Sequence, residues 1–129
     1  MLIIINNKKI RLGFIGAGFV GQIAHISNFL EVIDCELTAI AEVRPSLRSK
    51  VKQRYGFTRS YATHRELLAD KDLDAVVVVT PRHLTGPTVM DCLNSGKHVL
   101  SEKPMAGTSE QGLSLLAAAD DAKVRYCVG

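Results

Sequence analysis

Strand-length apolar runs alternate with segments of helical period along most of this 129-residue chain. The runs typical of strands cover residues 10–15, 36–41, 75–80, 98–101 and 125–128. The run 75–80 lacks polar alternation, which predicts a central strand buried on both faces. Alternation of strands and helices is typical of βαβ units, whose parallel strands are joined by crossing helices. The sequence therefore predicts an α/β fold with a doubly wound parallel sheet.

Cap residues indicate where the predicted helices begin and end. We expect the first helix from about residue 19 to 30, where apolar residues recur at Phe19, Val20, Ile23, Ala24, Ile26 and Leu30. Later helices are expected over residues 46–55, just after 63, over 84–94 and from 108 to about 122. The signals are Pro45 in a first turn, Gly56 and Gly96 as stops, and capping boxes formed by Thr63 with Glu66 and by Thr108 with Gln111.

Length and composition are those of one ordinary globular domain. Apolar residues make up 47% of the chain and charged residues 22%. The apolar run Ala75–Val79 is far shorter than the roughly 20 residues of a membrane span. At the start, the apolar MLIII precedes the basic residues, which is the reverse of the order in a signal peptide. We therefore expect a cytoplasmic protein without a membrane segment.

Charge and cysteine usage argue against nucleic-acid binding and metal binding. The net charge of +3 is small, Lys and Arg are scattered, and Trp is absent, so we expect no nucleic-acid partner. Cys35, Cys92 and Cys127 are far apart and lack metal-ligand spacing. We expect all three to be small buried residues in a reducing compartment, and we expect no metal site. Three histidines are interpreted as structural or surface residues: His25, His64 and His98.

The segment Gly16-Ala17-Gly18-Phe19-Val20-Gly21 matches G-x-G-x-x-G between the first predicted strand and the first predicted helix. Gly16 would permit the tight turn, Gly18 would let the backbone approach a pyrophosphate, and Gly21 would let the helix pack near the strand. The helix N-terminus offers N–H groups and a partial positive charge to phosphates. The sequence therefore predicts a dinucleotide site at Gly16, Gly18, Phe19, Val20 and Gly21.

An acidic residue follows at the position expected for the adenosine ribose. Glu42 lies 21 residues after Gly21, at the end of the second predicted strand, with Val43 and Arg44 beside it. A carboxylate there accepts hydrogen bonds from ribose hydroxyls and repels a 2′-phosphate, which favours NAD. Arg44 could pair with such a phosphate, so NADP stays open as the cofactor.

Two further segments lie where later strands end, which is where open parallel sheets bind ligands. They are Thr80-Pro81-Arg82-His83 and Ser101-Glu102-Lys103-Pro104. From the residues alone, both could also be simple connections between a strand and a helix.

Taken together, GAGFVG, IAEVRP, VVVVTPRHLTGP and GKHVLSEKPMAGT resemble the motifs of the glucose–fructose oxidoreductase and inositol dehydrogenase family (Gfo/Idh/MocA). The resemblance covers about Arg11 to Gly129. It implies that NAD or NADP is used to oxidise or reduce a carbinol carbon, often on a sugar or cyclitol.

The resemblance also implies roles for residues outside the glycine loop. Lys103 would be the catalytic lysine, because hydride transfer from a C–OH carbon needs a positioned acid or base at the hydroxyl. Glu102 would hold the nicotinamide ribose. The nicotinamide side of the cleft would be lined by Thr80, Pro81, Arg82 and His83. The usual family pattern there is Thr-Pro-Asn-x-x-His, and this chain has Arg82 and Thr85 in place of the amide and the imidazole.

In this family a second α/β domain supplies a catalytic Asp and His, substrate contacts and the oligomer interface, and nothing in this chain matches it. The chain ends one residue past a short apolar strand, as a fragment would. We expect residues 1–129 to be one dinucleotide-binding domain, inactive alone, from a parent enzyme that is a homo-oligomer and binds a small-molecule substrate. Two alternatives stay open: a non-catalytic NAD(P)-binding or sensing module, and a dehydrogenase for amino-acid-like or bilin-like substrates.

Overall fold

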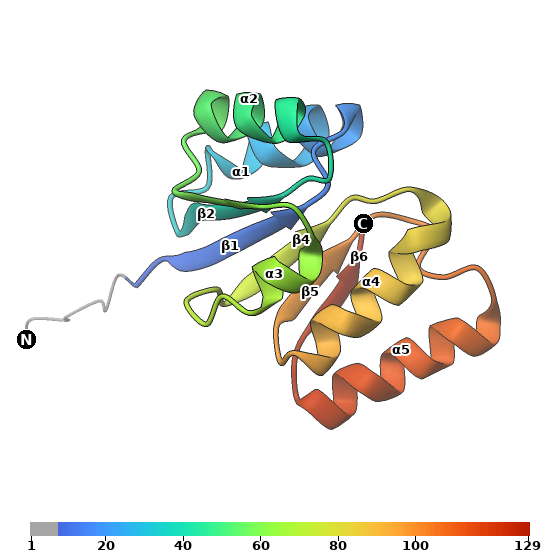
Figure 1. The fold of residues 1–129 in the computed structure, drawn as a ribbon. Helices are drawn as coiled ribbons and strands as arrows, with labels where there is room; N and C mark the ends of the chain where they lie inside the picture. Colours follow the sequence, from blue (N-terminus) through green and yellow to red (C-terminus); the bar gives the residue numbers. More distant parts are fainter. Residues whose placement is uncertain (1–7) are drawn as a thin grey trace, which may run out of the picture.

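The computed structural model describes residues 8–129 as a parallel sheet with helices on both faces (Figure 1). Residues 1–7, which include the apolar start of the sequence and belong to the predicted domain 1–129, lie outside the described residues. The strands are β1 (Ile10–Ile15), β2 (Cys35–Ala41), β3 (Arg59–Tyr61), β4 (Ala75–Val78), β5 (His98–Ser101) and β6 (Tyr126–Val128). Within 8–129 they form one six-stranded sheet in the order β3-β2-β1-β4-β5-β6.

This strand order confirms the doubly wound α/β prediction. Every pairing in the sheet is parallel, and the order reverses between β1 and β4. In open sheets of this kind ligands bind at that reversal, beyond the carboxyl ends of the strands. The predicted central strand is β4, in which Val76, Val77 and Val78 are all buried.

The helices divide between the two faces of the sheet. One face carries η1 (Gly21–Ile26), α1 (Ser27–Phe29) and α2 (Pro45–Tyr55). The opposite face carries α3 (His64–Leu68), α4 (Arg82–Asn94) and α5 (Ser109–Ala122), as Figure 1 shows. A core cluster lies under each set of helices: Phe14, Ile26 and Val51 belong to the first, and Val78, Leu93 and Leu115 to the second.

The predicted caps mostly hold. Gly56 and Gly96 adopt φ of 75°, the left-handed conformation that ends a helix. Thr63 and Glu66 form the full capping box of α3. The second predicted box is only half formed, because the side chain of Thr108 accepts from the N–H of Gln111 while Gln111 Oε1 accepts from the N–H of Gly107.

The first predicted helix differs from expectation in its winding. Residues 21–26 form a π-helix, whose hydrogen bonds span one more residue than those of an α-helix, before the short α1. Among the periodic apolar residues that predicted this helix, Ile26 is fully buried, whereas Phe19 and Ile23 are 78% and 57% exposed. The periodicity therefore placed the helix correctly but did not mark a continuous buried face.

The cysteine prediction is wrong for Cys127. Cys92 is buried on α4, and burial raises the pKa of its thiol to about 12. Cys35 is only partly buried. Cys127 is exposed because β6 is an edge strand of the described sheet.

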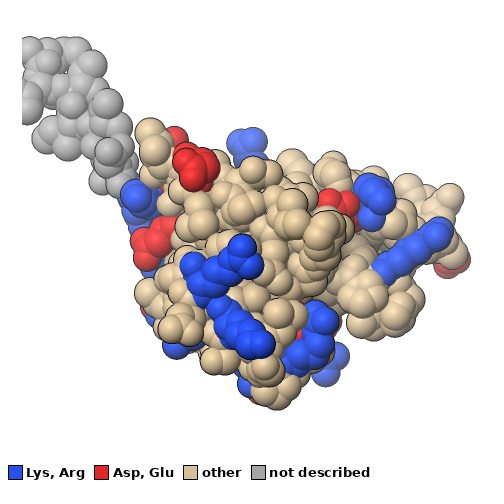
Figure 2. Space-filling view, turned by 90° about the horizontal axis from the view of Figure 1, so that it is seen from above, with Lys and Arg blue, Asp and Glu red and all other residues tan. Residues whose placement is uncertain are grey.

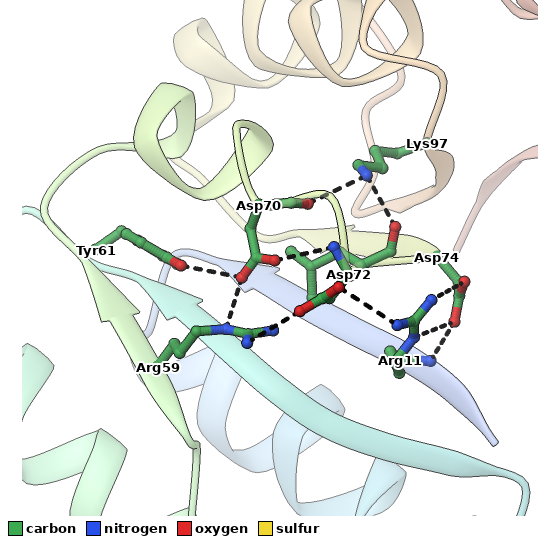
Figure 3. A network of polar contacts seen from close by, with 8 residues as sticks. Arg11, Arg59, Tyr61, Asp70, Asp72, Asp74 and Lys97 are labelled. Carbon is green, nitrogen blue, oxygen red and sulfur yellow. Dashed lines mark hydrogen bonds and ion pairs between the residues drawn. The ribbon is translucent and has the colours of Figure 1, made fainter.

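A polar network ties together the amino ends of the strands, at the edge opposite the glycine loop (Figure 3). Asp74 accepts from the backbone N–H, Nε and Nη2 of Arg11 at 2.9–3.1 Å. Asp70 accepts from the Tyr61 hydroxyl at 2.9 Å and lies 2.7 Å from Arg59 Nε, in a geometry that makes an ion pair but not a hydrogen bond. Lys97, which is buried, donates to the carbonyls of Leu73 and Asp70 at 2.8 and 3.3 Å.

No helix within residues 8–129 is long and apolar enough to cross a membrane. The same residues contain no group of three or more His, Cys, Asp or Glu side chains arranged to hold a metal ion. A cytoplasmic location stays a prediction.

Candidate functional site

A cavity of about 780 Å³ opens at the carboxyl ends of β1, β2 and β4, where the strand order reverses. Its lining comes from four connections that are far apart in the sequence. They are the glycine loop with the start of the following helix, the β2–α2 connection, the β3–α3 connection and the β4–α4 connection. Ten of the predicted site residues contribute to this lining: Gly16, Gly18, Phe19, Val20, Gly21, Glu42, Val43, Arg44, Thr80 and Pro81.

The three glycines of the loop differ in what a side chain at each position would meet. Gly16 has a φ of 94°, and a Cβ there would collide with the carbonyl oxygen of Val79. A Cβ on Gly21 would lie 3.0 Å from the carbonyl oxygen of Gly16, so Gly21 allows the helix to pack closely. Gly18 is different, because a Cβ there would meet no atom within 4 Å. The absence of a side chain at Gly18 therefore leaves open space rather than relieving a clash in the protein.

The open space at Gly18 leaves room for a diphosphate. The helix begins at the loop, with the N–H of Gln22 donating to the carbonyl of Gly18 at 3.0 Å. The N–H groups of a first helical turn lack intrahelical partners and carry the positive end of the helix dipole. A pyrophosphate can therefore approach the bare backbone at Gly18 and accept from these donors without a basic side chain. The residues present fit a dinucleotide.

Glu42 lies at the end of β2 and lines the cavity, but its carboxylate is bound by other groups of the protein. Its side chain is 4% exposed, and its Oε2 accepts from the N–H of Ala17 in the glycine loop at 3.1 Å. The guanidinium of Arg44 donates to both of its oxygens, at 2.8 and 3.1 Å. Burial alone would raise the pKa of Glu42, but the hydrogen bonds from Arg44 and Ala17 outweigh it and hold the pKa below its ordinary value. Glu42 is therefore a carboxylate at neutral pH, already engaged by the protein.

Apolar side chains make up much of the remaining wall. Phe19, Val43 and Leu84 all line the cavity and are 78%, 74% and 46% exposed. Exposed apolar side chains around a cavity with a few polar groups are typical of a small-molecule site. Val43 lies directly beside Glu42, so an aromatic base attached to a ribose at Glu42 would meet an apolar surface.

On the other side of the cavity, the β4–α4 connection contributes Thr80 and Pro81 to the lining, but not Arg82 or His83. The last two are exposed at the start of α4. Thr85 is buried, and its hydroxyl lies 3.2 Å from the hydroxyl of Thr80. The hydrogen bond between the two hydroxyls thus orients the Thr80 side chain from the buried Thr85.

Glu102 and Lys103 follow β5, at the strand end next to that of β4, and do not contribute to the lining of the cavity. Lys103 is exposed, and its N–H donates to the carbonyl of Gly129 at 3.2 Å. Glu102 is tied to the helix that follows the glycine loop, because its Oε1 lies 2.8 Å from Nε2 of His25. The hydrogen bond from His25 is the main reason that the pKa of Glu102 lies below its ordinary value.

Sequence reasoning missed two parts of this region. Ala62, Thr63, His64 and Arg65, which follow the short strand β3, line the cavity beside Glu42 and Arg44. The capping box at Thr63 was visible in the sequence, but the strand before it has no apolar run, so nothing indicated that a strand end delivers this loop to the site. His25 was interpreted as structural or surface, and its contact with Glu102 links it to the predicted nicotinamide side.

Charged side chains on the surface lie in several separate groups and do not form one continuous patch on the face shown in Figure 2. Figure 2 shows one face, on which Lys and Arg side chains form separate groups, some of them beside Asp and Glu side chains. Near the cavity, the cationic residues Arg44 and Arg65 belong to the lining, and Arg48 Nη1 donates to the backbone carbonyl of Glu42 at 2.7 Å. Both lining arginines are paired with carboxylates, Arg44 with Glu42 at 2.8 Å and Arg65 with Asp91 at 3.5 Å.

One family model and several known proteins match this chain. The model of one protein family, described as "Oxidoreductase family, NAD-binding Rossmann fold", matches residues 10–129. Levoglucosan dehydrogenase of Pseudarthrobacter phenanthrenivorans is 30% identical over 129 residues, which cover 94% of this chain and 33% of that protein. The NADP(+)-dependent scyllo-inositol 2-dehydrogenase IolW of Bacillus subtilis is 33% identical over 119 residues, which cover 92% of this chain and 32% of that protein.

A solved structure gives the same result for the fold. The WlbA dehydrogenase from Chromobacterium violaceum, in complex with NADH and UDP-GlcNAcA, superimposes with a TM-score of 0.90 at 32% identity. The match covers 100% of this chain and 38% of that one. The chain thus spans about a third of the length of the relatives that it matches.

Proposed function

Because the chain belongs to the GFO_IDH_MocA oxidoreductase family, with its NAD-binding Rossmann fold, we propose that it serves an enzyme oxidising or reducing a sugar or cyclitol-like substrate. In such an enzyme the bound nicotinamide takes or gives a hydride at a carbinol or carbonyl carbon. The observation that carries the proposal is the open backbone at Gly18, which lies at the start of a helix in the same cavity as Glu42 and Thr80.

The residues of the chain would divide the dinucleotide between them. The turn Gly16–Gly21 would hold the pyrophosphate, with Phe19 and Val20 against it, and Glu42, Val43 and Arg44 would take the adenosine end. The nicotinamide side would lie along Thr80 and Pro81, with Arg82 and His83 beyond the lining of the cavity. This division is supported by the order of the connections around the cavity, from the β2–α2 connection to the β4–α4 connection.

Glu102 and Lys103 would act at the reacting end. Glu102, held by His25, would accept from the nicotinamide ribose, and Lys103 would hold or move the proton of the substrate hydroxyl. The position of both residues after β5, next to the end of β4, supports this assignment.

The substrate of the whole enzyme is proposed from its relatives. Two of them are named for levoglucosan and scyllo-inositol, both polyhydroxylated rings with carbinol carbons. We propose that a second α/β domain of the parent enzyme supplies the remaining catalytic groups and the interface of a homo-oligomer. The 129-residue chain would then bind the cofactor without turnover.

One observation favours a second candidate, a non-catalytic NAD(P)-binding or sensing module. Glu102 and Lys103 lie outside the lining of the cavity, so the described cavity binds a dinucleotide without needing either of them.

The test is calorimetric titration of the chain with NADH and, separately, an assay of reduced nicotinamide formation from NAD⁺ and scyllo-inositol. We expect saturable binding with 1:1 stoichiometry and no turnover. If neither NADH nor NADPH bound to the chain, the cofactor role would be refuted. Turnover by the chain alone would refute the proposed division between two domains. To distinguish an enzyme from a sensor, the assay is repeated with the parent protein and its Lys103→Met variant. Only the enzyme hypothesis predicts turnover by the parent protein and its loss in the variant.

A further inference from the structure

Side chains hold both backbone groups of Ala17, the residue at the centre of the turn out of β1. Ala17 is fully buried. Its N–H donates to Oε2 of Glu42 at 3.1 Å, and its carbonyl accepts from Nε2 of Gln22 at 2.9 Å. The backbone of the glycine loop is therefore fixed by side chains up to the peptide group that precedes Gly18.

The bond from Gln22 also sets the direction of the next backbone donor. The carbonyl of Ala17 and the N–H of Gly18 belong to one trans peptide group, in which the two bonds point in opposite directions. Because the Gln22 amide holds the carbonyl, the N–H of Gly18 points away from that amide. Within residues 8–129 this N–H has no hydrogen-bond partner, and Gly18 lines the cavity. The Gly18 N–H is thus a free donor beside the open space at that residue.

The Gln22 amide is itself oriented by the neighbouring helix. Gln22 lies in the first turn of η1, and its Oε1 accepts from the hydroxyl of Tyr55 at 3.3 Å. Tyr55 is the last residue of α2 and is partly buried. Because the hydroxyl engages the amide oxygen, the NH₂ group is the part of the amide that faces the carbonyl of Ala17. One side chain therefore joins the glycine loop, η1 and α2.

Such fixing matters for binding more than for chemistry. A loop backbone that is already ordered loses less conformational freedom when a ligand contacts it, so the ligand binds more tightly. The benefit goes only to ligand groups that touch the fixed segment. At Gly18 the group that fits is the diphosphate of a dinucleotide, as the open backbone there indicates.

We propose that Gln22 is a positioning residue of the dinucleotide site: its amide holds the peptide group between Ala17 and Gly18 so that the Gly18 N–H is presented to the diphosphate. Tyr55 acts through Gln22 by orienting this amide. The inference rests on the proposed dinucleotide site. It assigns to Gln22 an effect on ligands with a diphosphate and none on the adenosine part.

The test is titration of wild type and Gln22→Met with three ligands: NADH, ADP and adenosine. Methionine keeps the length of the side chain and removes its donor. We expect the affinities for NADH and ADP to fall by about fivefold, while the affinity for adenosine stays the same. Tyr55→Phe removes only the hydroxyl that orients the amide. It should weaken the same two ligands by about two- to threefold and decides the question if Gln22→Met does not fold.

Gln53→Met is the matched control, because Gln53 is exposed on α2 and lies outside the lining of the cavity. It should change none of the three affinities. Wild-type affinity for NADH and ADP in Gln22→Met, or an equal loss for adenosine, would overturn the role of Gln22 and leave the dinucleotide site standing. Failure of wild type to bind either NADH or NADPH would overturn both.

Discussion

Nε2 of His25 lies 2.8 Å from Oε1 of Glu102, and this contact joins the helix after the glycine loop to the loop that carries Lys103. The two side chains are 13% and 21% exposed and come from positions 77 residues apart in the sequence. The contact starts in the π-helical segment, a winding that is often found at functional sites. This contact therefore links the segment at the pyrophosphate end of the predicted site directly to the segment at its reacting end.

Removal of this contact should be visible in the ionisation of Glu102. The hydrogen bond from His25 lowers the pKa of Glu102, so His25→Ala should raise that pKa toward the ordinary value. A carboxylate whose folded pKa is lowered adds stability above its ordinary pKa, and this stability disappears as pH falls through the lowered value. We expect His25→Ala to lose about 1 kcal/mol at neutral pH and nothing in acid below the lowered pKa.

NMR titration of the Glu102 carboxyl group and urea unfolding at several pH values measure these two effects. His25→Gln keeps a donor and should lose less stability than the alanine variant. An unchanged pKa of Glu102 in His25→Ala would show that the contact does not form in solution.

Alanine substitutions at two glycines of the loop should separate folding from binding. Gly18→Ala meets open space, so its stability should stay within about 0.5 kcal/mol of wild type while NADH affinity falls by about tenfold or more. Gly16→Ala places a Cβ against the Val79 carbonyl at a positive φ, and should cost at least about 2 kcal/mol of folding free energy. Thermal unfolding and NADH titration of both variants make the comparison.

Gly107→Ala is the control for an exposed loop glycine outside the cavity, since a Cβ there makes only an ordinary contact of 3.8 Å. It should change neither stability nor NADH affinity. Full NADH affinity in Gly18→Ala would place the pyrophosphate elsewhere.

Lys97 should stabilise the end of the sheet at which the strands begin. Its ammonium donates to two backbone carbonyls in the loop before β4 (Figure 3), and Lys97→Met leaves both without that partner. We expect a loss of about 2 kcal/mol in the free energy of unfolding, measured with urea. The matched substitution of the exposed Lys71 to Met in the same region should have almost no effect. Equal effects of the two would mean that the carbonyls of Leu73 and Asp70 gain nothing from Lys97.

The cysteines should differ sharply toward a thiol reagent. Cys127 is exposed and should react at once in the native protein, whereas Cys92 is buried with a pKa of about 12 and should react only after denaturation. Because Cys35 is partly buried, the test is made in a Cys35→Ser background, where the fast phase should be present and should disappear when Cys127→Ser is added. Absence of the fast phase in Cys35→Ser would contradict the exposed position of Cys127 on β6.

The main architecture could be predicted from the sequence because two local signals carry it. Buried parallel strands need unbroken apolar runs, as in β4, and the glycine loop needs residues whose spacing is fixed by one turn. The edge strand β3 could not be predicted in this way. Its residues Arg59–Tyr61 are polar or only partly buried, and they form a strand because β2 lies beside them.

The unpredicted features of the site depend on contacts between distant segments. Nothing at Glu42 or Ala17 indicates that the carboxylate turns toward the glycine loop, since the two residues meet only when β1 and β2 pair. The contact between His25 and Glu102 depends in the same way on the sheet and on the local π-helical winding. Spacing found the residues of the cofactor site, but the partners of their side chains come from the fold.

The most direct test of the dinucleotide site is a map of backbone amide shifts in the labelled chain as NADH is added. The account predicts saturable shifts at Gly18, Val20 and Glu42, with little change at Lys97 on the opposite edge. Saturating NADH that leaves the amides of Gly18, Val20 and Glu42 unmoved would contradict it.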